Sequence, residues 1–170
     1  EKIANIARSL GADVPFLRPS HLATDKSQDI GLFKHALNWL KENENYIPDF
    51  VVNLRPTSPI RYVKDIQAAI NLIISNGKID SVRSISAPAT TPFKMWKKSD
   101  TELLIPLLEI QGNKEPYNTP RQELPEVWAQ TGAIEVIRTN TISTLDSMSG
   151  VNVAGVEVSE ETYIDIDTQN

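Results

Sequence analysis

The sequence contains no cysteine, only two histidines and only seven glycines in 170 residues. Without cysteine there are no disulfides, no thiolate nucleophiles and no thiolate metal ligands. With only His21 and His35, a multi-histidine zinc site is not favoured, so any bound metal is expected to have carboxylate ligands, as Mg²⁺, Mn²⁺ and Ca²⁺ do. The glycines are too scattered for a Gly-x-Gly-x-x-Gly loop, which excludes the usual dinucleotide cradle.

Excess positive charge and long apolar runs are also missing. The 17 basic residues are outnumbered by 22 acidic ones, which argues against a nucleic-acid partner. No stretch approaches the roughly 18 apolar residues of a membrane span, and no signal peptide is evident, so a membrane location is not expected. The chain is 40% hydrophobic, enough to build the core of one globular domain.

Both ends of the sequence have incomplete helix signals. Helical periodicity begins at Glu1 without a preceding N-cap residue, and residues 168–170 resemble an N-cap region with no helix after it. We therefore expect residues 1–170 to be a single domain truncated at both ends.

Helical and strand patterns alternate along the first half of the chain and resume near its end. The patterns predict helices over 1–10, 30–40, 63–75 and 139–145, and strands over 14–17, 50–54, 81–87, 132–138 and 151–158. Such alternation predicts an α/β fold, a mainly parallel sheet flanked by helices.

Residues 88–126 interrupt this alternation with six prolines. We interpret them as an extended insertion that reaches away from the sheet. Basic residues lie among aromatic ones in this segment, a combination suited to bind a sugar acid. The candidate contacts to the sugar acid are Lys94, Arg121 and Gln122. The alternative for Trp96, Tyr117 and Trp128 is a subunit interface, where aromatic residues are enriched.

Three other segments carry candidate site residues. Arg55 and Arg61 follow the strand predicted over 50–54, where ligands of α/β sheets gather; the alternative is a proline-rigid turn that only caps the next helix. Asp165 and Asp167 have the spacing that puts two carboxylates on one face of a strand, although such a pair is more often a solvated edge. Arg18 and the polar loop 24–27 are suited to contact a nucleotide.

Taken in order, several short segments resemble the acylneuraminate cytidylyltransferase family, the CMP-sialic acid synthetases. The matching segments are Val-Pro-Phe-Leu-Arg-Pro at 14–19, Leu-Ala-Thr-Asp at 22–25, Leu-Arg-Pro-Thr-Ser-Pro at 54–59, Asp-Ser-Val-Arg-Ser at 80–84, Pro-Phe-Lys-Met-Trp at 92–96, Pro-Arg-Gln-Glu-Leu-Pro at 120–125, Thr-Gly-Ala-Ile at 131–134 and Asp-Ile-Asp at 165–167. They span nearly the whole chain, and their order is more specific than any one of them.

The resemblance implies a Rossmann-like nucleotidyltransferase fold, a cytoplasmic enzyme and a homodimer whose arm, residues 88–126, helps to complete the partner's site. The implied reaction joins CMP from CTP to a nine-carbon 2-keto sugar acid and releases pyrophosphate. By the same resemblance, catalytic Asp167 and Asp165 hold Mg²⁺ or Mn²⁺. CTP is contacted by Arg18, Asp25 and Ser27, and the sugar acid by Arg55, Lys94, Arg121 and Gln122.

The sequence departs from the family pattern in two places. The family's N-terminal Gly-rich loop, which binds CTP, is not in these residues, so this chain alone is expected to be inactive. Arg55 stands where glutamine is expected in sialic acid enzymes, which points to a different nonulosonic acid of the legionaminic or pseudaminic type. The alternatives are a synthetase for the eight-carbon acid Kdo and a non-catalytic sugar-acid-binding or dimerisation module.

Overall fold

A computed structural model of the chain describes residues 2–162, 164 and 166. In chain order the helices and strands are α1 (Lys2–Ser9), α2 (Asp29–Glu44), β1 (Phe50–Asn53), α3 (Val63–Ser75), β2 (Ser81–Ser86), β3 (Trp96–Lys98), β4 (Leu104–Pro106), β5 (Ala129–Arg138), α4 (Thr139–Ser143) and β6 (Val153–Glu157). Among the helices of this described part, none combines the length and the apolar character needed to cross a membrane.

The main sheet has four strands in the order β1–β5–β2–β6. The predicted α/β class is confirmed, but the described sheet is mixed rather than mainly parallel. β5 runs antiparallel to β1 and β2, whereas β2 and β6 are parallel. Residues 88–126 leave the sheet where β2 ends and return beside that end, so β5 runs back along β2 as in a hairpin. A parallel pair would instead need a crossover connection.

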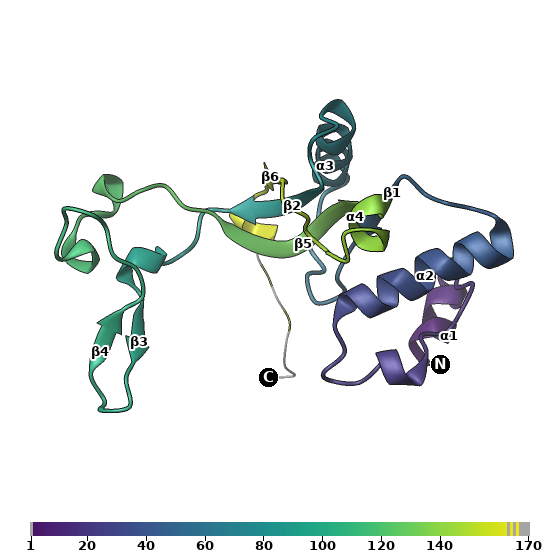
Figure 1. The fold of residues 1–170 in the computed structure, drawn as a ribbon, viewed down its shortest axis with the longest axis horizontal. Coiled ribbons are helices and arrows are strands. Elements are labelled where there is room, and N and C mark those ends of the chain that lie inside the picture. Colours follow the sequence, from purple (N-terminus) through teal and green to yellow (C-terminus); the bar gives the residue numbers. More distant parts are fainter. Residues whose placement is uncertain (1, 163, 165, 167–170) are drawn as a thin grey trace.

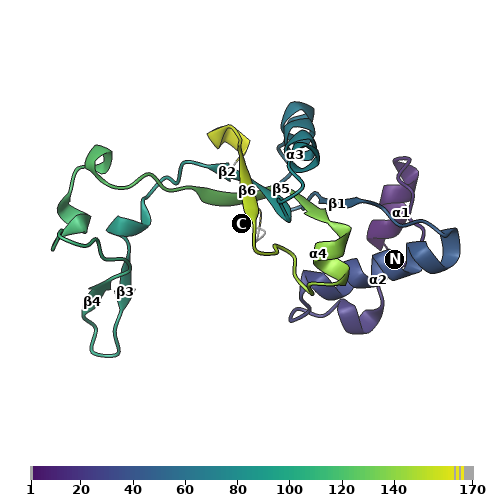
Figure 2. The same cartoon turned by 45° about the horizontal axis from the view of Figure 1, so that its top comes forward.

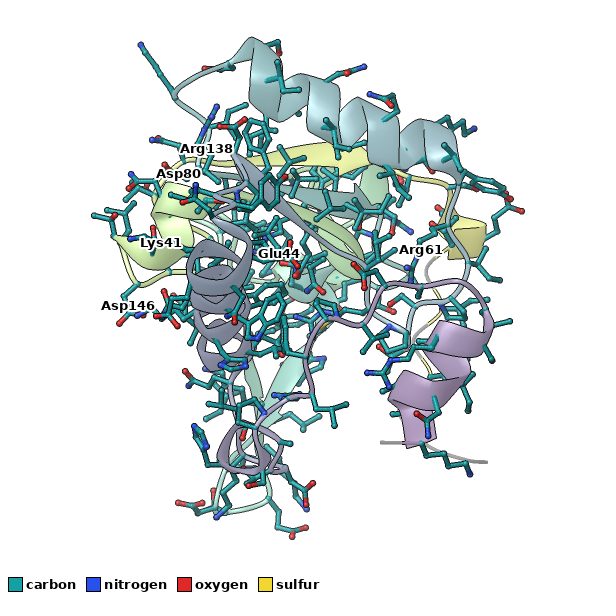
Figure 3. The ribbon with its side chains drawn as sticks, turned by 90° about the vertical axis from the view of Figure 1, so that its right-hand side faces the viewer. Lys41, Glu44, Arg61, Asp80, Arg138 and Asp146 are labelled. Atoms are coloured by element: carbon teal, nitrogen blue, oxygen red, sulfur yellow. The ribbon has the colours of Figure 1, made fainter. Side chains whose placement is uncertain are left out.

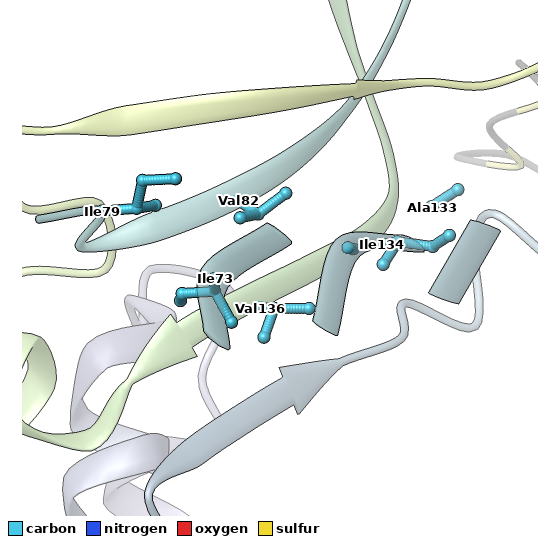
Figure 4. Close-up of a cluster of buried hydrophobic side chains, with 7 residues drawn as sticks. Ile73, Ile79, Val82, Ala133, Ile134 and Val136 are labelled. Carbon is cyan, nitrogen blue, oxygen red and sulfur yellow. The ribbon is translucent and has the colours of Figure 1, made fainter. Parts of the chain in front are cut away.

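Helices cover both faces of this sheet (Figure 1). On one face α3 packs on the larger core, which the strands supply with the mutually paired Val82 and Val136. Figure 4 shows these side chains in one cluster with Ile73 of α3 and Ile134 of β5. Burial of this apolar surface is the main stabilising term of the fold.

The opposite face carries a smaller core, in which Ile137 of β5 packs against Leu37 of α2 and Ile142 of α4. Because side chains alternate along a strand, Glu135 lies on the same face as Ile137. The sequence therefore places a carboxylate on the face of β5 that α2 and α4 cover.

Residues 88–126 lie to one side of the sheet, where they form the β3–β4 hairpin and several short turns (Figures 1 and 2). The ring of Trp96 lies 4.4 Å from that of Tyr117, which ties the hairpin to the return segment. Leu103, Leu104 and Ile105 are all more than half exposed near the hairpin tip.

The strand predicted over residues 14–17 is wrong, because this segment is irregular. It is held by a side chain instead of by strand pairing: the ring of Phe16 lies 5.0 Å from that of His35 and 5.5 Å from that of Trp39. His35 thus has the structural role of an aromatic neighbour in this segment.

Arg138, at the end of β5, closes the carboxyl end of α3. Its Nε donates to the carbonyl of Ile79 at 2.7 Å, and its Nη2 donates to the carbonyls of Ile73 at 2.7 Å and Asn76 at 3.1 Å. Carbonyls in the last turn of a helix have no partner within the helix. Arg138 therefore joins α3 to the sheet, beside Asp80 (Figure 3).

Replacing Arg138 by alanine is expected to lower the free energy of unfolding by about 3 kcal/mol, because hydrogen bonds from charged donors are lost and carbonyls are left unsatisfied. Urea denaturation measures the change. Lys41→Ala, on the exposed side of α2, is the control and is expected to change stability by less than about 0.5 kcal/mol. A loss for Arg138→Ala as small as that of the control contradicts the capping role.

Candidate active site

An open cleft of about 680 Å³ lies where β1 ends, between the start of α2 and the segment that connects α4 to β6. Its lining is largely polar and includes two arginines, Arg55 and Arg83, and three carboxylates, Asp29, Glu135 and Asp146. Ligands of α/β proteins commonly bind beyond the carboxyl ends of strands. This cleft is therefore the main candidate for a ligand site.

The floor of the cleft is a row of polar side chains that crosses three strands. Asn53, Glu135 and Arg83 lie opposite one another in the register of β1, β5 and β2. Asn53 Nδ2 donates to Glu135 Oε2 at 2.7 Å, and Arg83 Nη1 lies 2.6 Å from Glu135 Oε1. Gln130 Nε2 also donates to Oε1, at 3.0 Å. The nearly buried carboxylate is thus paired and hydrogen-bonded from both sides.

Arg55 lies above this row, at the mouth of the cleft. Its Nη2 is 2.9 Å from Asp29 Oδ2 and 3.5 Å from Glu135 Oε1. The side chain remains 42% exposed. A guanidinium held from below and open to solvent above is suited to bind a carboxylate or phosphate group.

The loop that carries Arg55 is folded around Arg61. Arg61 Nη2 donates to the carbonyls of both Arg55 and Ser58, and Ser58 itself is buried. Gly132 faces this loop with φ of 73°, a backbone conformation that favours glycine. The position of Arg55 therefore depends on both its own loop and the irregular start of β5.

The opposite wall of the cleft is anchored to the sheet through β2. Arg83 Nη2 donates to the carbonyl of Met148 and, at 3.0 Å, to Ser149 Oγ. The carboxylate of Asp80 accepts the backbone N–H groups of Asn152 at 2.8 Å and Val151 at 2.9 Å. The hydrogen bonds from Asn152 and Val151 lower the pKa of Asp80 below its usual value.

The predicted nucleotide-binding residues are only partly brought together. Ser27 lines the cleft. Its Oγ accepts a hydrogen bond from the backbone N–H of Thr24 at 3.1 Å, which closes the turn 24–27. Arg18 and Asp25 are exposed on the same connection, and the described lining of the cleft includes neither. Ser27 and Arg55, predicted for different substrates, thus share one cleft.

The predicted sugar-acid residues of the insertion lie elsewhere in the same chain. Arg121 and Gln122 line a second pocket of about 450 Å³ at the base of residues 88–126. Arg121 Nη2 donates to the carbonyl of Pro88 at 2.9 Å. Lys94 lies in the short turn Pro92–Lys94 and is half-buried. The structure therefore separates these three residues from Arg55.

Asp165 and Asp167 lie outside the described residues. Ile166, between them in sequence, is described, and its backbone N–H donates to the carbonyl of Thr57 at 2.8 Å. This hydrogen bond ties Ile166 to the loop of Arg55. Within the described part of the chain, no cluster of three or more histidine, aspartate and glutamate side chains is placed to hold a metal ion.

No family model matches the chain, so the comparison with known proteins rests on individual relatives. Over 99% of its length the chain is 25% identical to the post-translational flagellin modification protein B of Campylobacter coli, and it covers 69% of that protein. It is 26% identical to the CMP-N,N'-diacetyllegionaminic acid synthase of Campylobacter jejuni, with the same two coverages. Over 51% of its length it is 37% identical to the N-acylneuraminate cytidylyltransferase of Escherichia coli, of which it covers 19%.

These relatives support the acylneuraminate cytidylyltransferase family for this chain. The ordered series of short segments in the sequence predicted this family, and the relatives confirm it. Their alignment runs through both walls of the cleft, because it covers almost the whole chain.

The sequence-based prediction missed the floor of the cleft. Glu135 was not among the predicted site residues, and neither were Asn53, Gln130 or Asp29. A signal was present, since Glu135 interrupts the apolar run Ala-Ile-Glu-Val-Ile at 133–137. A charged residue inside a buried strand needs a partner, but the partners come from other strands and no local spacing identifies them.

The contact between Asp80 and the cleft wall predicts a pH-dependent contribution to stability. Because the pKa is lower in the folded protein, the contribution is present above the ordinary aspartate pKa of about 3.9 and is lost as the pH falls through the folded value. The stability difference between wild type and Asp80→Ala is therefore expected to be full at pH 7 and to shrink below about pH 4.

Urea denaturation at a series of pH values measures this difference. Asp100→Ala, at an exposed position in the turn of the β3–β4 hairpin, is the control and is expected to differ from wild type by the same amount at every pH. A stability difference for Asp80→Ala that stays constant down to pH 3 contradicts the role of the ionised carboxylate.

Proposed function

We propose that the protein transfers CMP from CTP to a nonulosonic acid and releases pyrophosphate. The proposal is carried by the alignment of 99% of the chain with a CMP-N,N'-diacetyllegionaminic acid synthase. The cleft adds physical support, because the partly exposed guanidinium of Arg55 and Ser27 line the same cleft. A synthetase for the eight-carbon acid Kdo is not favoured, since the relatives are named for nonulosonic acids.

In the proposed reaction, the anomeric hydroxyl oxygen of the sugar acid bonds to the α-phosphorus of CTP. The bond from that phosphorus to the oxygen bridging it to the β-phosphate breaks, pyrophosphate leaves, and the hydroxyl proton is released. The protein contributes mainly by positioning both substrates and stabilising charge. Arg55 pairs with the sugar carboxylate, and Arg18, Asp25 and Ser27 contact CTP. We expect the reaction to take place in the cytoplasm, where CTP is made.

Asp165 and Asp167 are the proposed ligands of Mg²⁺ or Mn²⁺. Two carboxylates two residues apart are a suitable donor set for these hard cations, which take oxygen ligands. The hydrogen bond from Ile166 to Thr57 supports the proposal, because it joins the described residue between them in sequence to the segment that carries Arg55. When bound, such an ion offsets the negative charge of the phosphates.

We further propose a homodimer in which residues 88–126 complete the cleft of the partner protomer. Within one chain, Arg121 and Gln122 line a different pocket from Arg55. A second copy offers a way for both sets of residues to contact one sugar acid. The exposed apolar side chains of Leu103, Leu104 and Ile105 support an interface on the same segment.

The proposed sugar acid is of the legionaminic type. A relative aligned over almost the whole chain is named for N,N'-diacetyllegionaminic acid. The sequence has Arg55 where glutamine was expected for sialic acid.

The proposal is tested by pyrophosphate release from the full-length protein with CTP, Mg²⁺ and a panel of nonulosonic acids and Kdo. Release is expected with a legionaminic-type acid and CTP, and not when ATP or GTP replaces CTP. Strict preference for N-acetylneuraminate would refute the proposed substrate but leave the reaction. No release from a folded, dimeric protein would favour the non-catalytic binding module.

The shared site predicts complementation between two inactive variants. Asp167→Ala and Arg121→Ala are each expected to lower turnover strongly, the first through the metal ligand and the second through the arm. Mixing them under conditions of subunit exchange is expected to restore about a quarter of wild-type activity, because half of the dimers then have one site free of both substitutions.

Size-exclusion chromatography and the pyrophosphate assay measure assembly and activity of the same mixture. Mixing each variant with itself is the matched control and is expected to restore nothing. If subunits exchange but the Asp167→Ala and Arg121→Ala mixture stays inactive, Arg121 does not act in the site of the partner.

A further inference from the structure

One contact of Glu135, on the cleft floor, is not needed to compensate for the burial of its carboxylate. Glu135 is 2% exposed, and a buried carboxylate costs free energy unless it is paired and hydrogen-bonded. Arg83, Asn53 and Gln130 already meet this requirement at 2.6, 2.7 and 3.0 Å. The additional contact, from Glu135 Oε1 to Arg55 Nη2 at 3.5 Å, reaches out of the sheet to a side chain on a loop.

This contact uses one edge of the Arg55 guanidinium. In the described part of the chain, the two ion pairs of Arg55, to Asp29 and to Glu135, are both made through Nη2. An arginine presents five N–H donors in a planar fork. Fixing Nη2 therefore sets the plane and direction of the remaining donors on Nη1 and Nε.

The two carboxylates differ in how firmly they are held. The Asp29 side chain is 39% exposed at the start of α2, whereas Glu135 is fixed on the central strand by Arg83, Asn53 and Gln130. A group supported by buried hydrogen bonds on a strand holds its position better than one on a loop or at a surface. Glu135 is thus the rigid reference for the orientation of Arg55.

We propose that Glu135 is a positioning residue, which orients Arg55 so that its free edge receives the carboxylate of the sugar acid. This inference rests on the proposed function and deepens it, because it assigns the selection of an acidic sugar to a residue that does not touch it. Glu135 acts through Arg55 and is not itself a catalytic residue. Its loss is expected to weaken binding of the acid without affecting CTP.

The closing experiment is a double-substitution cycle in the full-length protein. Glu135→Gln, which keeps the shape and removes the charge, is expected to raise KM for the sugar acid about tenfold while KM for CTP and kcat stay within about twofold. In an Arg55→Gln background the same substitution is expected to change KM for the acid by less than about twofold. Glu157→Gln, exposed on β6, is the matched carboxylate-to-amide control and is expected to leave all three parameters unchanged.

The cycle has clear contrary outcomes. Equal effects of Glu135→Gln in the wild-type and Arg55→Gln backgrounds would show that Glu135 does not act through Arg55. An unchanged KM for the acid would also overturn the inference. If Glu135→Gln does not fold, Glu135→Asp, which keeps the charge beside Arg83 but shortens the side chain, replaces it in the same cycle with the same expected rise in KM.

A second readout does not depend on turnover. Side-chain NMR of Arg55, assigned by comparison with Arg55→Gln, is expected to show separate Nη resonances in the wild type and averaged ones in Glu135→Gln. Identical spectra would overturn the positioning role even if the enzyme is active. Separate resonances in a wild type that turns over no nonulosonic acid would instead refute the proposed function and retain the contact.

Discussion

The buried carboxylate of Glu135 is the constraint on which the cleft depends. Removing an ion from water costs several kcal/mol, and only well-placed partners offset the cost. Those partners come from three strands, so the ion pair with Arg83 at 2.6 Å and the hydrogen bond from Asn53 at 2.7 Å hold β1, β5 and β2 in one register. A slip of one residue would turn Glu135 toward the apolar core under α3.

The ion pairs around the cleft also limit how strongly its charge attracts an anion. Arg55 and Arg83 are balanced by Asp29 and Glu135, and Asp146 is paired with Lys34 at 2.5 Å. An anionic substrate therefore gains little from the net charge of the described lining. Its affinity has to come from directed contacts, such as the guanidinium fork of Arg55, together with the metal ion and the partner's arm that we propose.

The elements of the fold were largely predictable from the sequence, because helix and strand periodicity is local. The helix predicted over 63–75 agrees with α3 at both ends, and the strand predicted over 50–54 agrees with β1 to one residue. The strand predicted over 14–17 failed because its apolar residues meet α2 instead of another strand. The predicted mainly parallel arrangement of the strands was wrong, because strand direction depends on where residues 88–126 return to the sheet.

For the candidate site, the sequence alone pointed to the family and selected Arg55 as a candidate residue, since both rest on short segments read in order. It also predicted Ser27 as a nucleotide contact. Only the tertiary structure decided that Arg55 and Ser27 share a cleft, that Arg121 and Gln122 line a different pocket, and that Glu135 supports Arg55 from below. The physical reason is that these contacts join residues far apart in the chain. Arg55 and Glu135 are 80 positions apart and are brought together by strand pairing, which no local pattern encodes.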